Sequence, residues 1–157
     1  MTANTTPIYS AAPSVQIGSG GAGTSLGAII GPSANTATDG TGANMYEIFQ
    51  ADATNGGRVE RIILKPIGTV AATVARVFLC QSTGAFTAGT TNTAANTALL
   101  TEMQLAAWTA SNTAASPQYE IPINMAMEPG TSLLMSFGTS TGAAGNGYNP
   151  ITIGGKY

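Results

Sequence analysis

The sequence predicts an all-β protein: an antiparallel β-sandwich, jelly-roll-like, with an extended N-terminal arm. Short runs rich in β-branched and aromatic residues recur along the chain and end in Gly, Pro or Asn, as strands bounded by turns do. Several of these runs alternate apolar and polar residues with a period of two. The runs number about seven or eight, and both tight turns and long loops separate them, which is typical of a sandwich or jelly roll.

Residues 1–44 are expected to form the extended arm, with one or two weak strands, and residues 45–157 the sandwich. The arm is rich in Ala, Gly, Ser, Thr and Pro and has small apolar islands at 8–9, 15–17 and 26–30. Such a segment buries too little surface to offset its own ordering entropy, so we expect it to be mobile or laid against another surface. Its candidate contact residues are Pro7, Ile8, Tyr9, Val15 and Ile17.

Residues 46–51 and 58–65 are the first two predicted strands, and a turn signal at 55–57 joins them. In the second strand, Ile62 and Leu64 are predicted to point inward. A bulge would place Val59 inside as well.

The third predicted strand, 70–79, alternates with a period of two, but this alternation does not show which of its two faces points inward. It ends next to Cys80, whose apolar neighbours indicate a small buried side chain rather than a reactive thiol. Residues 82–97 are rich in Thr, Ala and Asn and predict an exposed loop.

Residues 98–107 fit both a helix and a strand. Apolar residues at 99, 100, 103 and 107 would share one face of a helix. As a strand, the same segment would place residues 99, 101, 103 and 105 on one face and Glu102 and Gln104 on the other. The flanking loops suit a β-meander, so we favour the strand.

Residues 118–125 have the cleanest period of two in the chain. The predicted inward face consists of Tyr119, Ile121, Ile123 and Met125. Pro122 on the outer face indicates an edge or bulged strand, because proline cannot donate to a strand ladder. After a tight turn at 128–130, the inward set of the next strand is predicted to be Leu133, Met135 and Phe137. Residues 151–153 form the last predicted strand.

The composition argues against catalysis. The 157 residues include no histidine, one cysteine, seven acidic and five basic side chains. The G-x-S-x-G pattern at 23–27 has no histidine base to form a triad, and one thiol cannot build a zinc site. The G-x-G-x-x-G pattern at 18–23 lacks the βαβ unit of a dinucleotide site. We therefore expect neither an enzyme nor a bound cofactor.

The acidic residues are spread singly along the chain, so no two carboxylates are expected to face each other for acid–base catalysis. The glutamates interpreted as solvated outer-face residues are Glu47, Glu60, Glu102 and Glu120, with Arg58, Arg61 and Arg76 as candidate cross-strand partners. Asp39 with the oxygens of 41–44 could hold a weak calcium ion. A polar turn is the commoner structure for such a segment, and no metal is expected.

The low charge of the chain indicates which classes of partner to expect. A net charge of −2, with 8% charged residues, gives little self-repulsion, so association with copies of the chain or with a partner is expected. Five basic residues do not form the cluster that phosphate binding requires, so nucleic acid is not expected. No apolar run approaches the roughly 20 residues that span a bilayer, and the N-terminus lacks a secretory pattern. We expect no membrane partner and synthesis in the cytoplasm.

Trp108 lies between a predicted strand and a polar loop. It can be a core or rim residue, an interface anchor or a platform for a sugar ring. Together with Tyr148 it is the candidate aromatic contact of an interface or loop.

Four segments resemble the small jelly-roll decoration, or cement, proteins of tailed-bacteriophage head gene clusters: RVERIILKPIGT at 58–69, VARVFL at 74–79, YEIPI at 119–123 and GGKY at 154–157. The resemblance spans roughly residues 45–157. It implies a virion protein of the phage head surface, made in the host cytoplasm, which forms homotrimers and binds the major capsid protein.

In that role the chain would stabilise the head by cementing adjacent capsomers, without turning over a substrate. The arm would add strands or extended backbone contacts to the sheet edge of a neighbouring subunit. The alternative function is a receptor- or carbohydrate-binding module of a head fibre or tail tip, with Trp108, Tyr148 and loop hydroxyls as its contacts.

Overall fold

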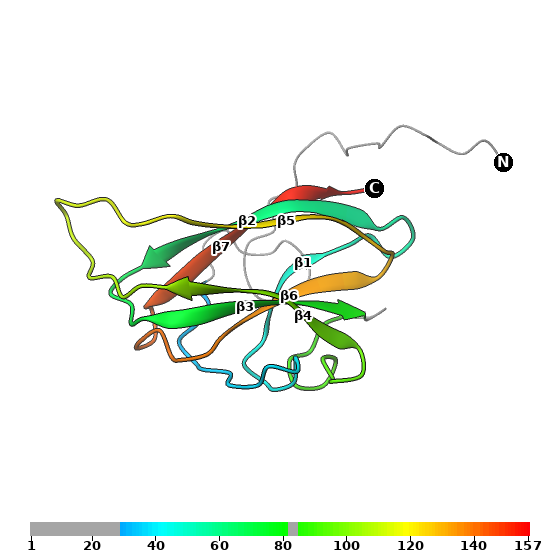
Figure 1. The fold of residues 1–157 in the computed structure, drawn as a ribbon, viewed down its shortest axis with the longest axis horizontal. Helices are drawn as coiled ribbons and strands as arrows, with labels where there is room; N and C mark the ends of the chain where they lie inside the picture. Colours follow the sequence, from blue (N-terminus) through cyan, green and yellow to red (C-terminus); the bar gives the residue numbers. More distant parts are fainter. Residues whose placement is uncertain (1–28, 82–84) are drawn as a thin grey trace.

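A computed structural model describes residues 29–81 and 85–157 and has two antiparallel sheets packed as a sandwich (Figure 1). The strands are β1 (Tyr46–Gln50), β2 (Gly57–Ile67), β3 (Thr73–Gln81), β4 (Thr97–Leu105), β5 (Tyr119–Met127), β6 (Thr131–Phe137) and β7 (Gly147–Lys156). One sheet has the order β1-β6-β3-β4 and the other β5-β2-β7. The predicted all-β antiparallel sandwich is confirmed.

The strand pairs are nested in the sequence: the two middle strands pair with each other, and the strands before and after them pair in turn. β3 pairs with β4, β2 with β5 and β1 with β6. Ile30 extends the series, because it forms an antiparallel bridge with Tyr148 at the start of β7. The chain is thus a long hairpin folded in half and rolled up. With the segment at Ile30 as an eighth element, this is the jelly-roll arrangement.

The bulge considered for the second strand lies at Glu60. The register of β2 shifts between Val59 and Arg61 against both of its neighbours, β5 and β7. As a result Val59 is fully buried, as are Ile62 and Leu64. Two residues of β5 lie opposite Glu60, and one of them, Asn124, has a φ of 48°. Asparagine is among the few non-glycine residues that adopt this left-handed conformation readily.

Residues Thr97–Leu105 form a strand, so the preference for a strand over a helix is confirmed. In the neighbouring strand β3, Ala75 and Val77 point into the main core. Phe78 and Cys80 instead belong to a second, smaller cluster with Met45 and Leu134 on the opposite face of the sheet. Cys80 is buried, as predicted, and burial raises the pKa of its thiol.

Loops cover that opposite face, and two predictions of exposure are wrong there. Asn92, in the loop predicted to be exposed, is 2% exposed and donates hydrogen bonds to the carbonyl oxygens of Gly40 (2.7 Å) and Gly42 (3.0 Å). Glu47, predicted to be solvated, is also 2% exposed, and its carboxylate accepts a hydrogen bond from the Ser132 hydroxyl. Loops from distant parts of the sequence exclude water from both side chains.

The C-terminal half follows the predicted pattern more closely. β5 is an edge strand with a bulge, as Pro122 indicated, and its inward side chains pack against the core as predicted. The turn at 128–130 carries the chain from one sheet to the other. All seven residues of β6 are buried, because the core covers one face and the loops the other. The last strand is longer than predicted: it starts at Gly147 rather than at 151.

Candidate functional site

The arm contacts Pro7, Ile8, Tyr9, Val15 and Ile17 lie outside the described residues. The described chain starts at Ile29, and Ile30 is its first fully buried residue. The Ile30 amide donates to the Tyr148 carbonyl oxygen (2.9 Å), and the Tyr148 amide donates to the Ile30 carbonyl oxygen (2.8 Å). The sandwich therefore holds the chain at residue 30. None of the twelve charged side chains of the protein lies before residue 39.

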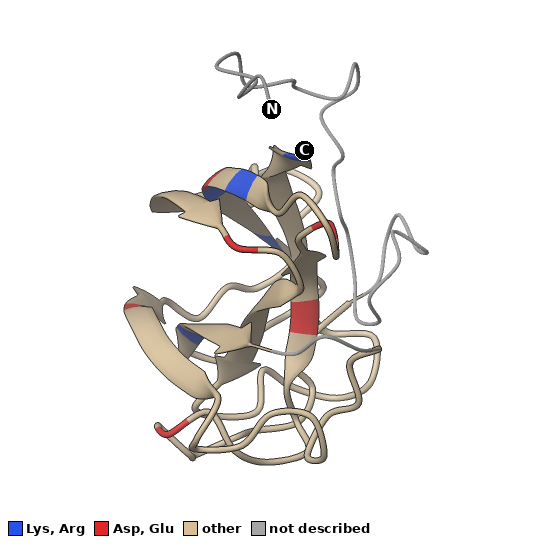
Figure 2. Ribbon diagram, turned by 90° about the vertical axis from the view of Figure 1, so that its right-hand side faces the viewer, with Lys and Arg blue, Asp and Glu red and all other residues tan. Residues whose placement is uncertain are grey.

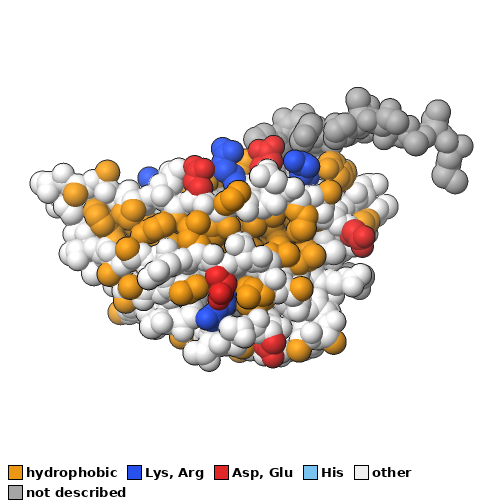
Figure 3. Space-filling view, viewed as in Figure 1, with side chains coloured by type: hydrophobic (Ala, Val, Ile, Leu, Met, Phe, Trp, Pro, Cys, Tyr) orange, Lys and Arg blue, Asp and Glu red, His pale blue; other side chains and the backbone are white. Residues whose placement is uncertain are grey.

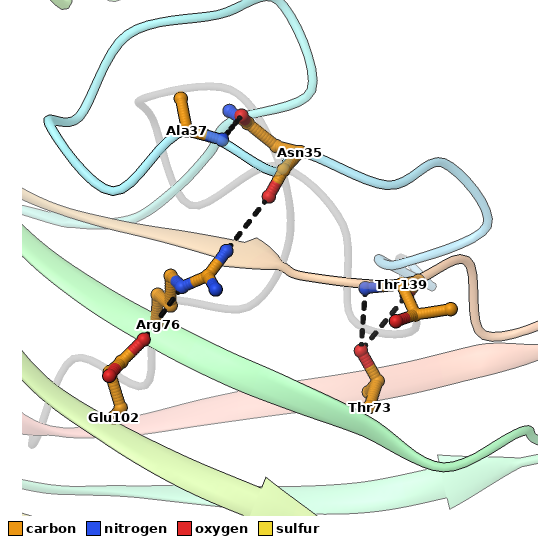
Figure 4. Close-up of polar contacts among 6 residues, drawn as sticks. All are labelled: Asn35, Ala37, Thr73, Arg76, Glu102 and Thr139. Carbon is orange, nitrogen blue, oxygen red and sulfur yellow. Dashed lines mark hydrogen bonds and ion pairs between the residues drawn. The ribbon is translucent and has the colours of Figure 1, made fainter.

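After the bridge at Ile30, residues 35–44 contact the four-stranded sheet, although the sequence assigns them to the arm. The Asn35 amide donates to the Phe137 carbonyl oxygen at 2.8 Å. The Arg76 guanidinium donates both to the Asn35 carbonyl oxygen (3.1 Å) and to the Glu102 carboxylate (2.7 Å), as Figure 4 shows. Arg76 and Glu102 are cross-strand partners in β3 and β4. Arg76, one of the candidate cross-strand partners of the glutamates, is thus confirmed in that role, and its guanidinium also fastens Asn35 to the sheet.

Trp108 is half-buried. Its backbone forms an isolated bridge with Val70, with hydrogen bonds of 2.8 and 2.9 Å, and its side chain packs against the main core. Trp108 thus packs at the rim of the core, in the segment between the end of β4 at Leu105 and the start of β5 at Tyr119. Figure 1 shows the long loop that this segment forms.

Tyr148 is a core residue, so the prediction that it forms a loop or interface contact is wrong. Its side chain is fully buried, and its ring stacks on Phe137 at a centroid distance of 5.5 Å and meets Tyr119 edge-on at 6.3 Å. Burial, with a smaller contribution from Tyr119, raises the pKa of Tyr148 to about 12. The structure does not bring Trp108 and Tyr148 together on an exposed face.

Charged residues are few and scattered over both sheets (Figure 2). Asp39 accepts hydrogen bonds from the Thr41 hydroxyl (2.7 Å) and amide (3.0 Å), which lower the pKa of its carboxyl. The segment is thus a polar turn. No group of three or more His, Cys, Asp or Glu side chains within residues 29–81 and 85–157 could hold a metal ion. Over the same ranges, no helix is long and apolar enough to cross a membrane.

The two sides of the sandwich differ. On one side the sheets are tied together by the Thr152 hydroxyl, which donates to the Ile48 carbonyl oxygen at 3.0 Å between β7 and β1. The other side lies between the edge strands β4 and β5. We call it the open side and define it by Met103 on β4 and Tyr119, Ile123 and Met125 on β5, which pack against the core and are partly buried. The alternation along 98–107 predicts that Leu99 shares the face of Met103, but the bulge at Leu100 pairs Leu99 with Phe78 on the other face of the sheet.

Comparison with known proteins identified no relative of this chain. No protein-family model matches the chain, and neither the curated proteins nor the solved structures contain a significant match.

Proposed function

We propose that this chain is a non-enzymatic structural protein of a phage virion, which binds the outer surface of the head as a homotrimer and cements adjacent capsomers. The observation that carries the proposal is the resemblance of four sequence segments to decoration proteins. Those segments fall in β2, β3, β5 and β7, so they belong to the rigid body of the jelly roll. Jelly rolls recur in viral capsid proteins, but they also serve other functions, so the fold alone does not determine the role.

The physical character of the molecule supports this role. A rigid sandwich with few charges offers a surface for self-association. The 28 residues before Ile29 carry apolar islands and no charged side chain, which suits an extended contact with the major capsid protein. Many copies on one lattice bind multivalently, so each contact can be weak while the shell as a whole is strengthened.

The alternative of a receptor- or carbohydrate-binding module has less support. It requires aromatic side chains grouped on one exposed loop face. Tyr148 is buried in the core and Trp108 packs at the rim, so the two residues do not form such a platform. We therefore retain the capsid-binding role.

The decisive experiment measures how much of the chain binds to phage heads that lack it. Deletion of residues 1–20 is expected to weaken attachment at least about tenfold, a loss of roughly 1.4 kcal/mol, while the melting temperature stays within a few degrees of that of the full chain. Folding should survive because Ile30, the first buried residue of the described chain, is retained.

A sharper variant keeps the length of the arm and replaces Ile8, Tyr9, Val15 and Ile17 by serine. Its matched control replaces four arm threonines, at positions 2, 5, 6 and 24, by serine. Attachment should fall for the first variant and not for the second. If the truncated protein occupied heads as fully as the intact chain, the arm would have no part in binding, and failure of the intact chain to bind heads would overturn the proposed function itself.

A further inference from the structure

The two outer faces of the sandwich differ in what covers them. On the four-stranded sheet, loops lie over the face away from the main core, where Phe78 is fully buried. On the three-stranded sheet, Arg61 and Lys65 alternate along β2 with buried Ile62 and Leu64 and are themselves exposed. The described chain places no loop over this second outer face (Figure 1). The outer face of the three-stranded sheet is therefore accessible to a partner.

This outer face combines basic and apolar side chains. Alternation along β2 places Arg61, Ile63 and Lys65 on it in a row. On the neighbouring strand β7, Ile151 pairs with Ile63. Ile153, which pairs with Arg61, lies on the same face. The three isoleucines belong to neither hydrophobic cluster of the described residues and are partly exposed. We call this surface the basic face and define it by Arg58, Arg61, Ile63 and Lys65 on β2 and Ile151 and Ile153 on β7.

The basic side chains of this face have no partner in the described part of the chain. Arg58 lies between the buried residues Gly57 and Val59, so it points outward as well. Within residues 29–81 and 85–157, Arg58, Arg61 and Lys65 form no hydrogen bond or ion pair. Their charges are therefore available to the carboxylates of another molecule.

Charge is divided unequally over the molecule. The strands of the three-stranded sheet carry four basic and two acidic side chains, a net charge of +2: Arg58, Arg61, Lys65 and Lys156 against Glu60 and Glu120. The rest of the chain carries one basic and five acidic side chains, a net charge of −4. Figure 3 shows most of the blue side chains at the top, over the three-stranded sheet, with red ones among them. An acidic surface would thus attract this sheet and repel the rest of the molecule.

The arm joins the sandwich at the edge of the same sheet. Ile30 pairs with Tyr148, whereas β2 pairs with the other edge of β7, so Ile30 lies at the border of the three-stranded sheet. The arm, which is proposed to contact the capsid protein, therefore ends beside the basic face. A single partner surface can contact the arm and the basic face together.

We propose that the basic face binds an acidic protein surface, whose carboxylates pair with Arg58, Arg61 and Lys65 and whose apolar side chains cover the three isoleucines. The inference rests on the proposed function and deepens it: the outer face of the three-stranded sheet is the side turned to the capsid, and acidic groups of the shell are what it contacts. Apolar contact supplies affinity, while the charges orient the chain and speed its encounter with the shell.

The residues of the basic face favour a protein over a nucleic acid as the partner. Binding of a phosphate backbone needs a denser cluster of cations, and stacking of bases needs aromatic side chains. Isoleucines separate the cations here, and none of the outward residues of β5, β2 and β7 is aromatic.

The test measures binding of the full-length protein to phage heads that lack it, by co-sedimentation. The wild type is expected to bind less tightly as NaCl rises from 0.05 to about 0.5 M, because salt screens exposed charges. Arg61→Gln combined with Lys65→Gln is expected to raise the dissociation constant about tenfold at low salt and to flatten this dependence. Both side chains are exposed, so the melting temperature should stay near that of the wild type.

The matched control is Asn112→Glu combined with Ala115→Glu, at two exposed residues of the long loop between β4 and β5. It lowers the net charge by the same two units as the glutamine variant, but away from the basic face, so binding should stay near that of the wild type. Ile151→Thr tests the apolar contact. It keeps a β-branched residue in the strand and is expected to raise the dissociation constant about threefold at every salt concentration.

A glutamine variant that binds heads as tightly as the wild type would overturn the inference and leave the proposed function standing. A control as weak as the glutamine variant would also overturn it, because net charge rather than this face would then decide binding. Heads that bind no wild-type protein would overturn the proposed function and the inference together. A DNA duplex of about 20 base pairs is the second probe: binding that the glutamine variant loses would make phosphate the ligand and overturn the proposed protein partner.

Discussion

At the level of single residues, the largest departure from expectation is Tyr148. Its neighbours Gly145, Asn146 and Gly147 indicate a turn, and a tyrosine after a turn suggests a surface contact. The pairing of Tyr148 with Ile30 instead draws its ring between Phe137 and Tyr119. The hydroxyl group is buried and has no hydrogen-bond partner among the described residues. A buried polar group without a partner opposes folding.

Tyr148→Phe is therefore expected to leave the free energy of unfolding unchanged or to raise it by about 1 kcal/mol, because it removes the oxygen and keeps the ring. Tyr148→Ala is expected to lower it by about 3–5 kcal/mol, since a cavity replaces the largest side chain of the core. Urea unfolding measures both. A loss above 1 kcal/mol for Tyr148→Phe would mean that the hydroxyl group has a stabilising partner.

The same residue predicts an alkaline dependence of stability. The pKa of Tyr148 is about 12 in the folded protein and about 10 in an unfolded chain. Below pH 10 both states hold the proton. Between pH 10 and 12 the unfolded state loses it first, so stability falls by up to about 1.4 kcal/mol per pH unit. The melting temperature of Tyr148→Phe should fall less steeply over this window, and parallel curves for the two proteins would contradict the assignment.

At the level of elements, the nested pairing explains how a segment without a recognisable strand pattern joins the fold. Ile30 completes the series of pairs because Gly147, the residue before its partner Tyr148, has no side chain. A Cβ atom at Gly147 would collide with the carbonyl oxygen of Ile30 and lie 2.7 Å from Cγ2 of Ile29. The first element of the jelly roll therefore depends on a glycine in the last strand.

Gly147→Ala is expected to lower the free energy of unfolding by about 1–3 kcal/mol, because the backbone of residues 29–30 must move away from β7. Gly155→Ala, in the same strand, is the matched control: nothing lies within 4 Å of its Cβ position, and its effect should be small. Urea unfolding of the two variants measures the difference. Equal losses would mean that the bridge at Ile30 adds nothing to stability.

At the level of the whole molecule, the low charge decides how the protein can interact. Twelve charged side chains on 157 residues leave shape and apolar contact as the main means of association. The contact between copies in the proposed homotrimer is therefore expected to depend little on ion pairs, and salt would screen little of its energy.

The trimer mass is accordingly expected to persist from 0.05 to about 1 M NaCl, since salt screens charge but does not weaken apolar burial. Sedimentation velocity across this range measures it. A trimer that dissociates at high salt would instead indicate an interface held by ion pairs.

Local patterns in the sequence determined most of the strands. The period of two identified the inward face of β5, the inward residues of β2 with its bulge, and β4 as a strand, because burial on one side of a sheet requires alternation. Composition argued for a binding role. These features depend on residues that are close along the chain, so a single sequence carries them.

Only the tertiary structure decided which side chains are covered from a distance. Glu47 and Asn92 are polar and would be solvated on an isolated strand or loop, but residues from other parts of the chain lie over them. Tyr148 is buried because Ile30, more than a hundred residues earlier, pairs with it. The open side exists because β4 and β5 end their sheets on the same side. Each of these depends on contacts between residues far apart in sequence, which periodicity does not encode.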